Sequence, residues 1–277
     1  MSWSEREQQV WSEIARWEEQ QFSNIGTDFS RTYQKLVKSG FHEFGGNWSH
    51  KMLTKLDDML FHLQAIVQQG RFDEQARDHL LTQARIFRSD IYSIQDMKKL
   101  SIDQLRFIAK KQLARQRLTA LAQGGITGIG GLAFFLSDLP FMLAINLRTT
   151  QLVALTYGYD MRKPYEMMLV LKVFHAISLP RSLQGEAWNY LYQEISNIED
   201  DVLFYDGEED ITTQAWMQRP LNNILKLFFL SFARKKLIQG IPVFSIAVGA
   251  ASNYNFAKEI ATSSHYFYQK RWLLEKS

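Results

Sequence analysis

The sequence of 277 residues contains no cysteine and only five prolines. Without cysteine the chain has no disulfide, no thiolate metal site and no cysteine nucleophile, so a reducing cytosolic compartment is the simplest expectation. Proline makes up about 2% of the chain, against an average usage of about 5%. Because apolar residues recur at spacings of three and four and rarely alternate, the sequence predicts long helices.

We expect no secretory signal in this chain, and the common catalytic motifs are absent from its sequence. Residues 2–7 are acidic and aromatic, where a signal peptide has a basic stretch followed by an apolar one. There is no Gly-x-x-x-x-Gly-Lys-Ser/Thr, no His-Glu-x-x-His and no Gly-x-Ser-x-Gly, and no two of the six histidines are three or four residues apart. We therefore expect no cofactor, no metal, no catalytic residue and no enzymatic activity.

The net charge is small. The chain has 32 basic and 29 acidic residues, a formal charge of +3. That balance gives no reason to expect nucleic acid as a partner.

Helical periodicity covers most of the sequence. The two tryptophans of residues 4–22 share one apolar stripe with Trp3 among glutamates, and we expect this helix to dock onto the protein rather than onto anionic lipid. Ser101 and Gln104 form a capping box at the start of another helix. The sequence predicts an all-α, multi-helix bundle with an N-terminal helical region, 1–97, and a helical core, 98–277. Its helices are expected at 4–22, 29–39, 49–69, 73–88, from 101 onward, 147–159, 164–177, 182–198, 218–236 and 256–272, with an acidic linker at 199–210.

Two runs, 118–137 and 237–257, contain no charged residue and are long enough to cross a bilayer, although glycines dilute both and the second also contains Pro242. Small residues four apart, such as Gly124 and Gly128, leave one helix face nearly bare so that another helix can approach closely. Tight packing in a bundle and insertion into or against a bilayer both fit this pattern. We predict two apolar helical hairpins, 118–159 and 237–272, and the similar order of features in them leaves an internal repeat open.

A basic cluster precedes each uncharged run. Such clusters flank membrane segments that face anionic cytoplasmic lipid, whereas the alternative is a pair of solvated helix faces. The candidate membrane-contacting residues are Lys110, Lys111, Arg115, Arg117, Arg234, Lys235 and Lys236.

These runs and the segments after them resemble the EcsC family over residues 98–274. The resemblance implies a bacterial protein that is associated with an ABC transport system at the cytoplasmic membrane and has no established activity, and it supplies no catalytic residue. His265 stands where a small residue is expected, so local packing there should differ. The residues that carry the resemblance, which we take as motif and packing residues, are Gly124, Gly128, Gly131, Asp138, Pro140, Arg148, Tyr157, Gly158, Pro242, Gly249, Asn253 and Arg271.

The sequence and the resemblance together predict a non-enzymatic, membrane-associated accessory protein. Its expected partners are anionic lipid of the cytoplasmic membrane and ABC transporter subunits, and its expected place is the cytoplasmic side of that membrane, peripheral or partly inserted. Two alternatives stay open. One is a soluble helical scaffold that binds proteins through Trp3, Trp11 and Trp17. The other is a lipid-binding or small-molecule-binding protein, or an enzyme, with a pocket near Asp138, Tyr157 and Asn253.

Overall fold

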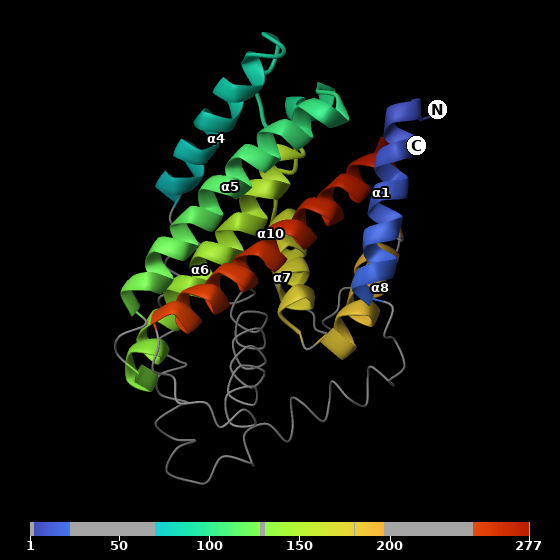
Figure 1. Cartoon of the computed structure of the whole chain (residues 1–277). Coiled ribbons are helices and arrows are strands. Elements are labelled where there is room, and N and C mark those ends of the chain that lie inside the picture. The colour runs from blue at the N-terminus through green and yellow to red at the C-terminus, as the bar shows by residue number, and fades with distance from the viewer. Residues whose placement is uncertain (1–2, 23–69, 128–130, 180, 197–245, 277) are drawn as a thin grey trace. The chain divides into compact units, whose positions relative to one another are not determined.

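The structure is a computed structural model, and it describes residues 3–22, 70–127, 131–179, 181–196 and 246–276 (Figure 1). These residues form α-helices and one 3-10 helix and contain no strand, which confirms the predicted all-α, multi-helix fold. The helices are α1 (Glu5–Phe22), α4 (Gly70–Arg85), η1 (Gln95–Lys99), α5 (Ile102–Thr127), α6 (Gly131–Thr156), α7 (Pro164–Ser178), α8 (Arg181–Ser196) and α10 (Ile246–Lys276).

Most predicted helix starts are found where the local signals place them. Ser101 and Gln104 form the expected capping box before α5: the Ser101 backbone N–H donates to Gln104 Oε1 at 2.9 Å, and the Gln104 N–H donates to Ser101 Oγ at 3.4 Å. Pro164 is the first residue of α7, a position that needs no backbone donor. The helices expected at 29–39, 49–69 and 218–236 and the acidic linker lie outside the described residues.

The predicted helix at 147–159 is only the second half of a longer one. α6 begins at Gly131 and continues through Asp138 and Pro140 to Thr156, although a proline in a helix interior cannot donate the usual backbone hydrogen bond. The uncharged run 118–137 is thereby divided between the end of α5 and the start of α6. From Ile246 the second run belongs to the single long helix α10, and the hairpin proposed for 237–272 stays a prediction.

Contacts divide the chain into two compact units: residues 1–15, 65–170 and 242–277 form the first, and residues 16–64 and 171–241 form the second. In the first unit, α5 and α6 run antiparallel, α10 packs against both, and α4 lies beside them (Figure 1). The buried apolar side chains that join these helices include Leu105 and Ile108 of α5, Leu143 of α6 and Ile260 of α10. The division into 1–97 and 98–277 stays a prediction.

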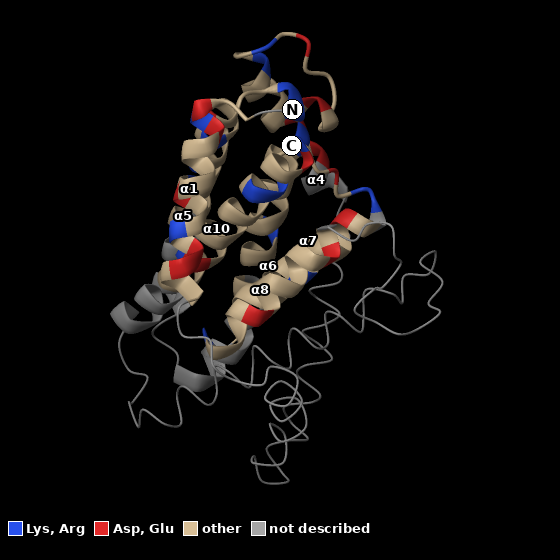
Figure 2. Ribbon diagram, turned by 90° about the vertical axis from the view of Figure 1, so that its right-hand side faces the viewer, with Lys and Arg blue, Asp and Glu red and all other residues tan. Residues whose placement is uncertain are grey.

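The first turns of α1 belong to the first unit and dock there through the predicted apolar stripe. Val10 and Ile14 are fully buried, and the Trp3 indole N–H donates to the carbonyl oxygen of Leu273 at 3.3 Å. The outer surface of the helix carries both acidic and basic residues (Figure 2). Hydrogen bonds and ion pairs join Arg6 to Asp103 and Lys276 to Glu7, so the two ends of the described chain lie close together.

The described part of the second unit consists of the ends of α1 and α7 and the whole of α8. The Trp188 indole N–H donates to Glu18 at 2.8 Å, and the rings of Trp17 and Trp188 lie 5.6 Å apart, edge to face. Lys172 of α7 forms an ion pair with Glu194 of α8 at 2.5 Å. Burial lowers the pKa of His175 to about 4.

Among the described residues, no helix combines the length and the apolar composition that crossing a bilayer requires. The basic cluster Arg234, Lys235 and Lys236, together with Pro242 and Gly128, lies outside those residues.

Candidate functional site

The connection from α6 to α7, in the first unit, begins with Tyr157, Gly158, Tyr159 and Asp160. The Gly158 N–H donates to the carbonyl of Leu155, and the Tyr159 N–H donates to the carbonyl of Ala154, both at 3.0 Å. This pair of hydrogen bonds is the Schellman motif, which ends a helix with one residue in the left-handed region. Gly158 is that residue, with φ of +89°. We call these four residues the 157–160 turn.

Gly158 also permits a close approach between the 157–160 turn and η1. A Cβ at this position would lie 2.6 Å from Cγ of Lys98 and 3.3 Å from the carbonyl oxygen of Ile94. Glycine therefore satisfies two requirements here, a positive φ and the absence of a side chain.

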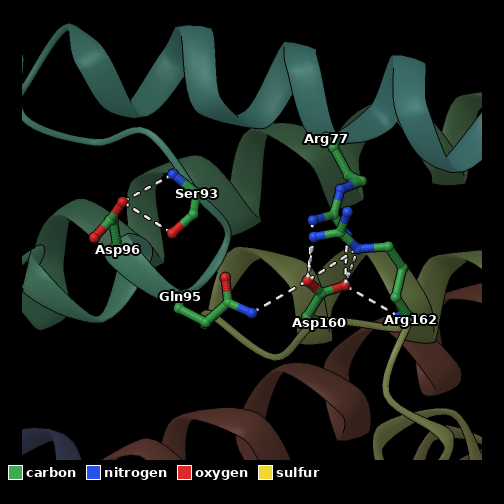
Figure 3. Close-up of polar contacts among 6 residues, drawn as sticks. All are labelled: Arg77, Ser93, Gln95, Asp96, Asp160 and Arg162. Atoms are coloured by element: carbon green, nitrogen blue, oxygen red, sulfur yellow. Dashed lines mark hydrogen bonds and ion pairs between the residues drawn. The ribbon is translucent and has the colours of Figure 1, made fainter.

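Asp160 lies at the centre of a buried ion cluster (Figure 3). Its carboxylate accepts two hydrogen bonds from Arg77 of α4, at 2.5 and 3.0 Å, and others from Arg162 and from Gln95 of η1. Burial alone would raise the pKa of Asp160, but the hydrogen bonds from Arg77 and Arg162 outweigh burial and hold this pKa below its usual range. The cluster thus joins α4, η1 and the turn.

A second carboxylate, that of Asp96, holds the segment before η1 in place through hydrogen bonds. Asp96 accepts hydrogen bonds from the backbone N–H and the hydroxyl of Ser93, at 2.8 and 2.9 Å (Figure 3). It also accepts one from the backbone N–H of Tyr92 at 3.0 Å. Hydrogen bonds from Lys99 and from these backbone groups lower the pKa of Asp96. Gln95 is thereby held next to Asp160.

Tyr159 lies beside a second ion cluster, centred on Arg271 of α10. Arg271 donates to both carboxylate oxygens of Glu166 of α7, at 2.6 and 2.9 Å, and to Glu275 at 2.9 Å. Its guanidinium carbon lies 3.8 Å from the centre of the Tyr159 ring, and Lys98 lies 4.4 Å from the same ring while it pairs with Glu275 at 2.5 Å. This cluster ties α7, α10 and η1 to the turn.

Tyr157, the first residue of the 157–160 turn, contacts α10. Its side chain is fully buried, and its hydroxyl lies 3.2 Å from Nδ1 of His265, whose Nε2 lies 3.2 Å from the amide nitrogen of Gln269. Burial raises the pKa of the Tyr157 hydroxyl well above its ordinary value. The histidine that replaces an expected small residue is therefore accommodated by two polar partners.

The structure brings together some of the motif residues and leaves others apart. Tyr157, Gly158 and Arg271 meet at the 157–160 turn. Gly124 lies in α5, and Gly249 and Asn253 lie in α10, while α6 holds Gly131, Asp138, Pro140 and Arg148. Arg148 is half-buried, and this burial lowers its pKa.

Four of the seven basic residues predicted to contact lipid lie on α5. Lys110, Lys111 and Arg115 are exposed, and Arg117 belongs to the same helix. No acidic residue occurs between positions 104 and 137, so the local charge of this helix is strongly positive. The described cluster of basic residues is therefore accessible from solvent.

The charged partners at the 157–160 turn were not predicted. Arg77 is 83 residues from Asp160 in sequence, and Glu166 is 105 residues from Arg271. Each is one charged residue among several on an amphipathic helix, and no local spacing distinguishes it from its neighbours. Glu166 carries a weak signal only, as an acid in the first turn of α7.

The arrangement holds helices in place. In the part of the chain that the structure describes, no three His, Asp or Glu side chains gather as the ligands of a metal ion would. Both buried carboxylates at the turn, Asp160 and Glu166, are neutralised by arginine side chains. Pairing of this kind lowers the free energy cost of burying a charge and fixes the positions of the helices that carry the partners.

Comparison with known proteins gives the family. The model of the EcsC protein family matches residues 8–273. An uncharacterized protein of Bacillus subtilis (strain 168), YdbA, is 26% identical over 215 residues, which cover 75% of this chain and 75% of that protein. Protein EcsC of the same organism is 25% identical over 183 residues, which cover 65% of this chain and 69% of that protein. No solved structure matches the chain. Because the family match extends over almost the whole sequence, the 157–160 turn and α5 included, the chain belongs to the EcsC protein family.

Proposed function

We propose that the protein is a non-enzymatic accessory protein of an ABC transport system. Electrostatic attraction to anionic lipid holds it on the cytoplasmic side of the bacterial cell membrane. The observation that carries the proposal is the exposure of Lys110, Lys111 and Arg115 on one helix, in a stretch without acidic residues. Cytoplasmic leaflets contain anionic lipid, which attracts such a cluster.

The expected attraction is weak and reversible. Each basic residue near an anionic surface contributes about 1 kcal/mol, so three residues contribute about 3 kcal/mol. The attraction acts over about 10 Å at moderate ionic strength and weakens as salt is added. A protein held in this way leaves the membrane in high salt, whereas an inserted helix does not.

The link to a transport system rests on the family. What supports the link is the resemblance of the motif residues, which implies an ABC transporter as a partner, together with membership of the family, in which a relative in Bacillus subtilis is named Protein EcsC. Purification of the tagged chain from membranes of its native host should recover the ATPase or permease subunit of an ABC transporter. Recovery of neither subunit, from membranes that do retain the tagged chain, would contradict this part of the proposal.

The membrane part is tested by fractionating cells of the native host and washing the membranes with high salt and then with alkaline carbonate. We expect the protein in the membrane fraction and its release by salt. Retention through both washes would instead indicate insertion, and its absence from membranes would contradict the proposal.

A pair of charge-matched variants makes the test specific. Lys110→Glu with Lys111→Glu should lower the membrane-bound fraction by more than about tenfold. The control is Lys163→Glu with Arg181→Glu, which makes the same change in charge at two exposed positions. Both control positions are at helix N-termini, where a carboxylate is favourable, so the control should fold. Equal loss in the two variants would indicate an effect of net charge alone.

A further inference from the structure

The exposed face of α5 is apolar as well as basic. Phe107 is 60% exposed and Leu118 is 66% exposed, although large apolar side chains are usually buried. They share this face with exposed residues three or four positions apart. We call this set the α5 stripe: Phe107, Lys110, Lys111, Ala114, Arg115 and Leu118.

The order of residues around α5 separates its exposed apolar side chains from its basic side chains. At 3.6 residues per turn, Phe107, Ala114 and Leu118 fall within about 40° of one another, and Lys110 and Arg115 fall on opposite sides of them. The α5 stripe is therefore an apolar line about 17 Å long with a basic residue on each flank. The opposite face of α5, which includes Leu105, Ile108 and Leu113, is buried in the first unit.

The apolar line continues beyond α5. The ring of Phe87, which follows α4, meets the ring of Phe107 edge to face at 5.9 Å, and the neighbouring Ile86 is 78% exposed. Asp103 lies one turn before Phe107, and its carboxylate is held by Arg6 at 3.0 Å. Two segments that are distant in the sequence thus present one surface of aromatic, aliphatic and basic residues.

We propose that α5 lies flat in the headgroup region of an anionic bilayer, with Phe107, Ala114 and Leu118 entering the boundary with the acyl chains and the flanking basic residues contacting lipid phosphate. This inference rests on the proposed function and adds the binding surface, its orientation and its depth. The charge of the α5 stripe is complementary to anionic lipid, and its combination of phenylalanine and leucine with lysine and arginine is typical of helices that bind in the plane of the interface. Basic side chains on both flanks reach the phosphates while their methylene stems remain in apolar surroundings.

The experiment uses the absence of cysteine from the chain. A single cysteine, introduced as Ala114→Cys, carries a polarity-sensitive dye into the centre of the α5 stripe without removing a large side chain. The matched control is Ala15→Cys, at an exposed alanine of α1 whose neighbourhood includes Glu19. Both labelled proteins are mixed with vesicles of phosphatidylglycerol and phosphatidylcholine, and with vesicles of phosphatidylcholine alone.

We expect the dye at position 114 to shift to the blue with the anionic vesicles and to be quenched by lipids brominated on their acyl chains, and the dye at position 15 to do neither. Phe107→Ser with Leu118→Ser should weaken binding by about tenfold with little change in its salt dependence. Lys110→Gln with Lys111→Gln should weaken it by about 25-fold and reduce the salt dependence. All positions are exposed, so the thermal midpoint measured by circular dichroism should remain close to that of the parent.

The outcomes separate this inference from the proposed function. If the chain binds anionic vesicles but the dye at position 114 remains in water, the inference is wrong and the membrane proposal stands. If the chain binds no vesicle and no native membrane, both fail. If the dye responds to native membranes but not to vesicles made from the lipids extracted from them, the α5 stripe contacts a membrane protein, and the lipid assignment is overturned.

Discussion

The 157–160 turn and the α5 stripe both belong to the first unit and differ in how far their charged groups are exposed to solvent. At the turn, Asp160 and Arg271 are buried, and each has an oppositely charged partner from another helix within 3.0 Å. On α5, Lys110, Lys111 and Arg115 face solvent next to exposed apolar side chains. Breaking a buried pair is expensive, whereas removing an exposed charge costs little. The comparison predicts that variants at the turn affect stability and that variants of the α5 stripe affect binding.

Loss of Arg271 should have the largest effect on stability. Arg271→Met leaves the Glu166 carboxylate, whose side chain is 10% exposed, without its bidentate partner in the interior. An unpaired buried charge of this kind costs about 3–5 kcal/mol of the free energy of unfolding. Urea unfolding followed by circular dichroism should show that loss as a lower midpoint.

The double variant Arg271→Met with Glu166→Leu tests the cause, because it removes both charges and should recover most of the lost stability. Arg181→Met, at an exposed position at the start of α8, is the matched control and should change the free energy of unfolding by less than about 0.5 kcal/mol. If Arg181→Met and Arg271→Met cost the same, the contrast between buried and exposed charge does not hold.

Asp160→Asn should be the next most costly change. It removes the negative charge that pairs with buried Arg77 and weakens the hydrogen bonds from Arg162, which we expect to cost about 2–3 kcal/mol at neutral pH. Thermal or urea unfolding at neutral pH measures this loss. Asp90→Asn, in an exposed pair with Arg88, is the matched control and should cost less than about 1 kcal/mol.

The same carboxylate predicts a dependence on pH. The pKa of Asp160 is lower in the folded protein than the value of about 3.9 in an unfolded chain, so its contribution is fully present above that value and is lost as the pH falls toward the folded pKa. The difference in free energy of unfolding between the parent and Asp160→Asn should therefore be constant between about pH 7 and pH 5 and should shrink at about pH 3. A difference that grows as the pH falls would show that Asp160 is protonated in the native state.

Gly158→Ala tests whether the backbone conformation of the 157–160 turn, as well as its charge pairs, contributes to stability. A side chain at φ of +89° is strained, and the new Cβ would meet Lys98 and the backbone of η1. We expect a loss of about 2 kcal/mol, since a non-glycine residue in such a conformation costs about 1–3 kcal/mol. The double variant Gly158→Ala with Lys98→Ala removes the closest contact of the new Cβ. The stability that it regains relative to Gly158→Ala measures the cost of crowding, and the loss that persists measures the cost of backbone strain. Full restoration would contradict the requirement for glycine at this φ.

Local signals predicted several helix starts but not the contacts between the helices. The capping box at Ser101 and the proline at position 164 mark helix starts because the physics of a helix end is confined to a few neighbouring residues. Pro140 lies in the interior of α6, which continues through it because packing of α6 against α5 and α10 compensates for one missing hydrogen bond. A helix boundary therefore depends on tertiary contacts that no short window of sequence contains.

The candidate site shows the same limit. Tyr157, Gly158 and Arg271 were named from the resemblance to a family, which points to positions without saying what each side chain contacts. The Schellman motif could be expected from a glycine after a helix, but its close approach to η1 could not. Arg77 and Glu166 contact residues that are 83 and 105 positions away, and only the fold determines which of the many charges become partners.

The smallest expected effect on stability completes the comparison. Lys110→Gln with Lys111→Gln should change the free energy of unfolding by less than about 0.5 kcal/mol, because both side chains are exposed and glutamine is a good helix former. The same variant is expected to lose most of its affinity for anionic vesicles. Urea unfolding and vesicle sedimentation on one protein preparation measure both properties. A loss of stability as large as that of Asp160→Asn would mean that these lysines hold the fold together, as the residues of the 157–160 turn do, and that their exposure is not a sign of an external partner.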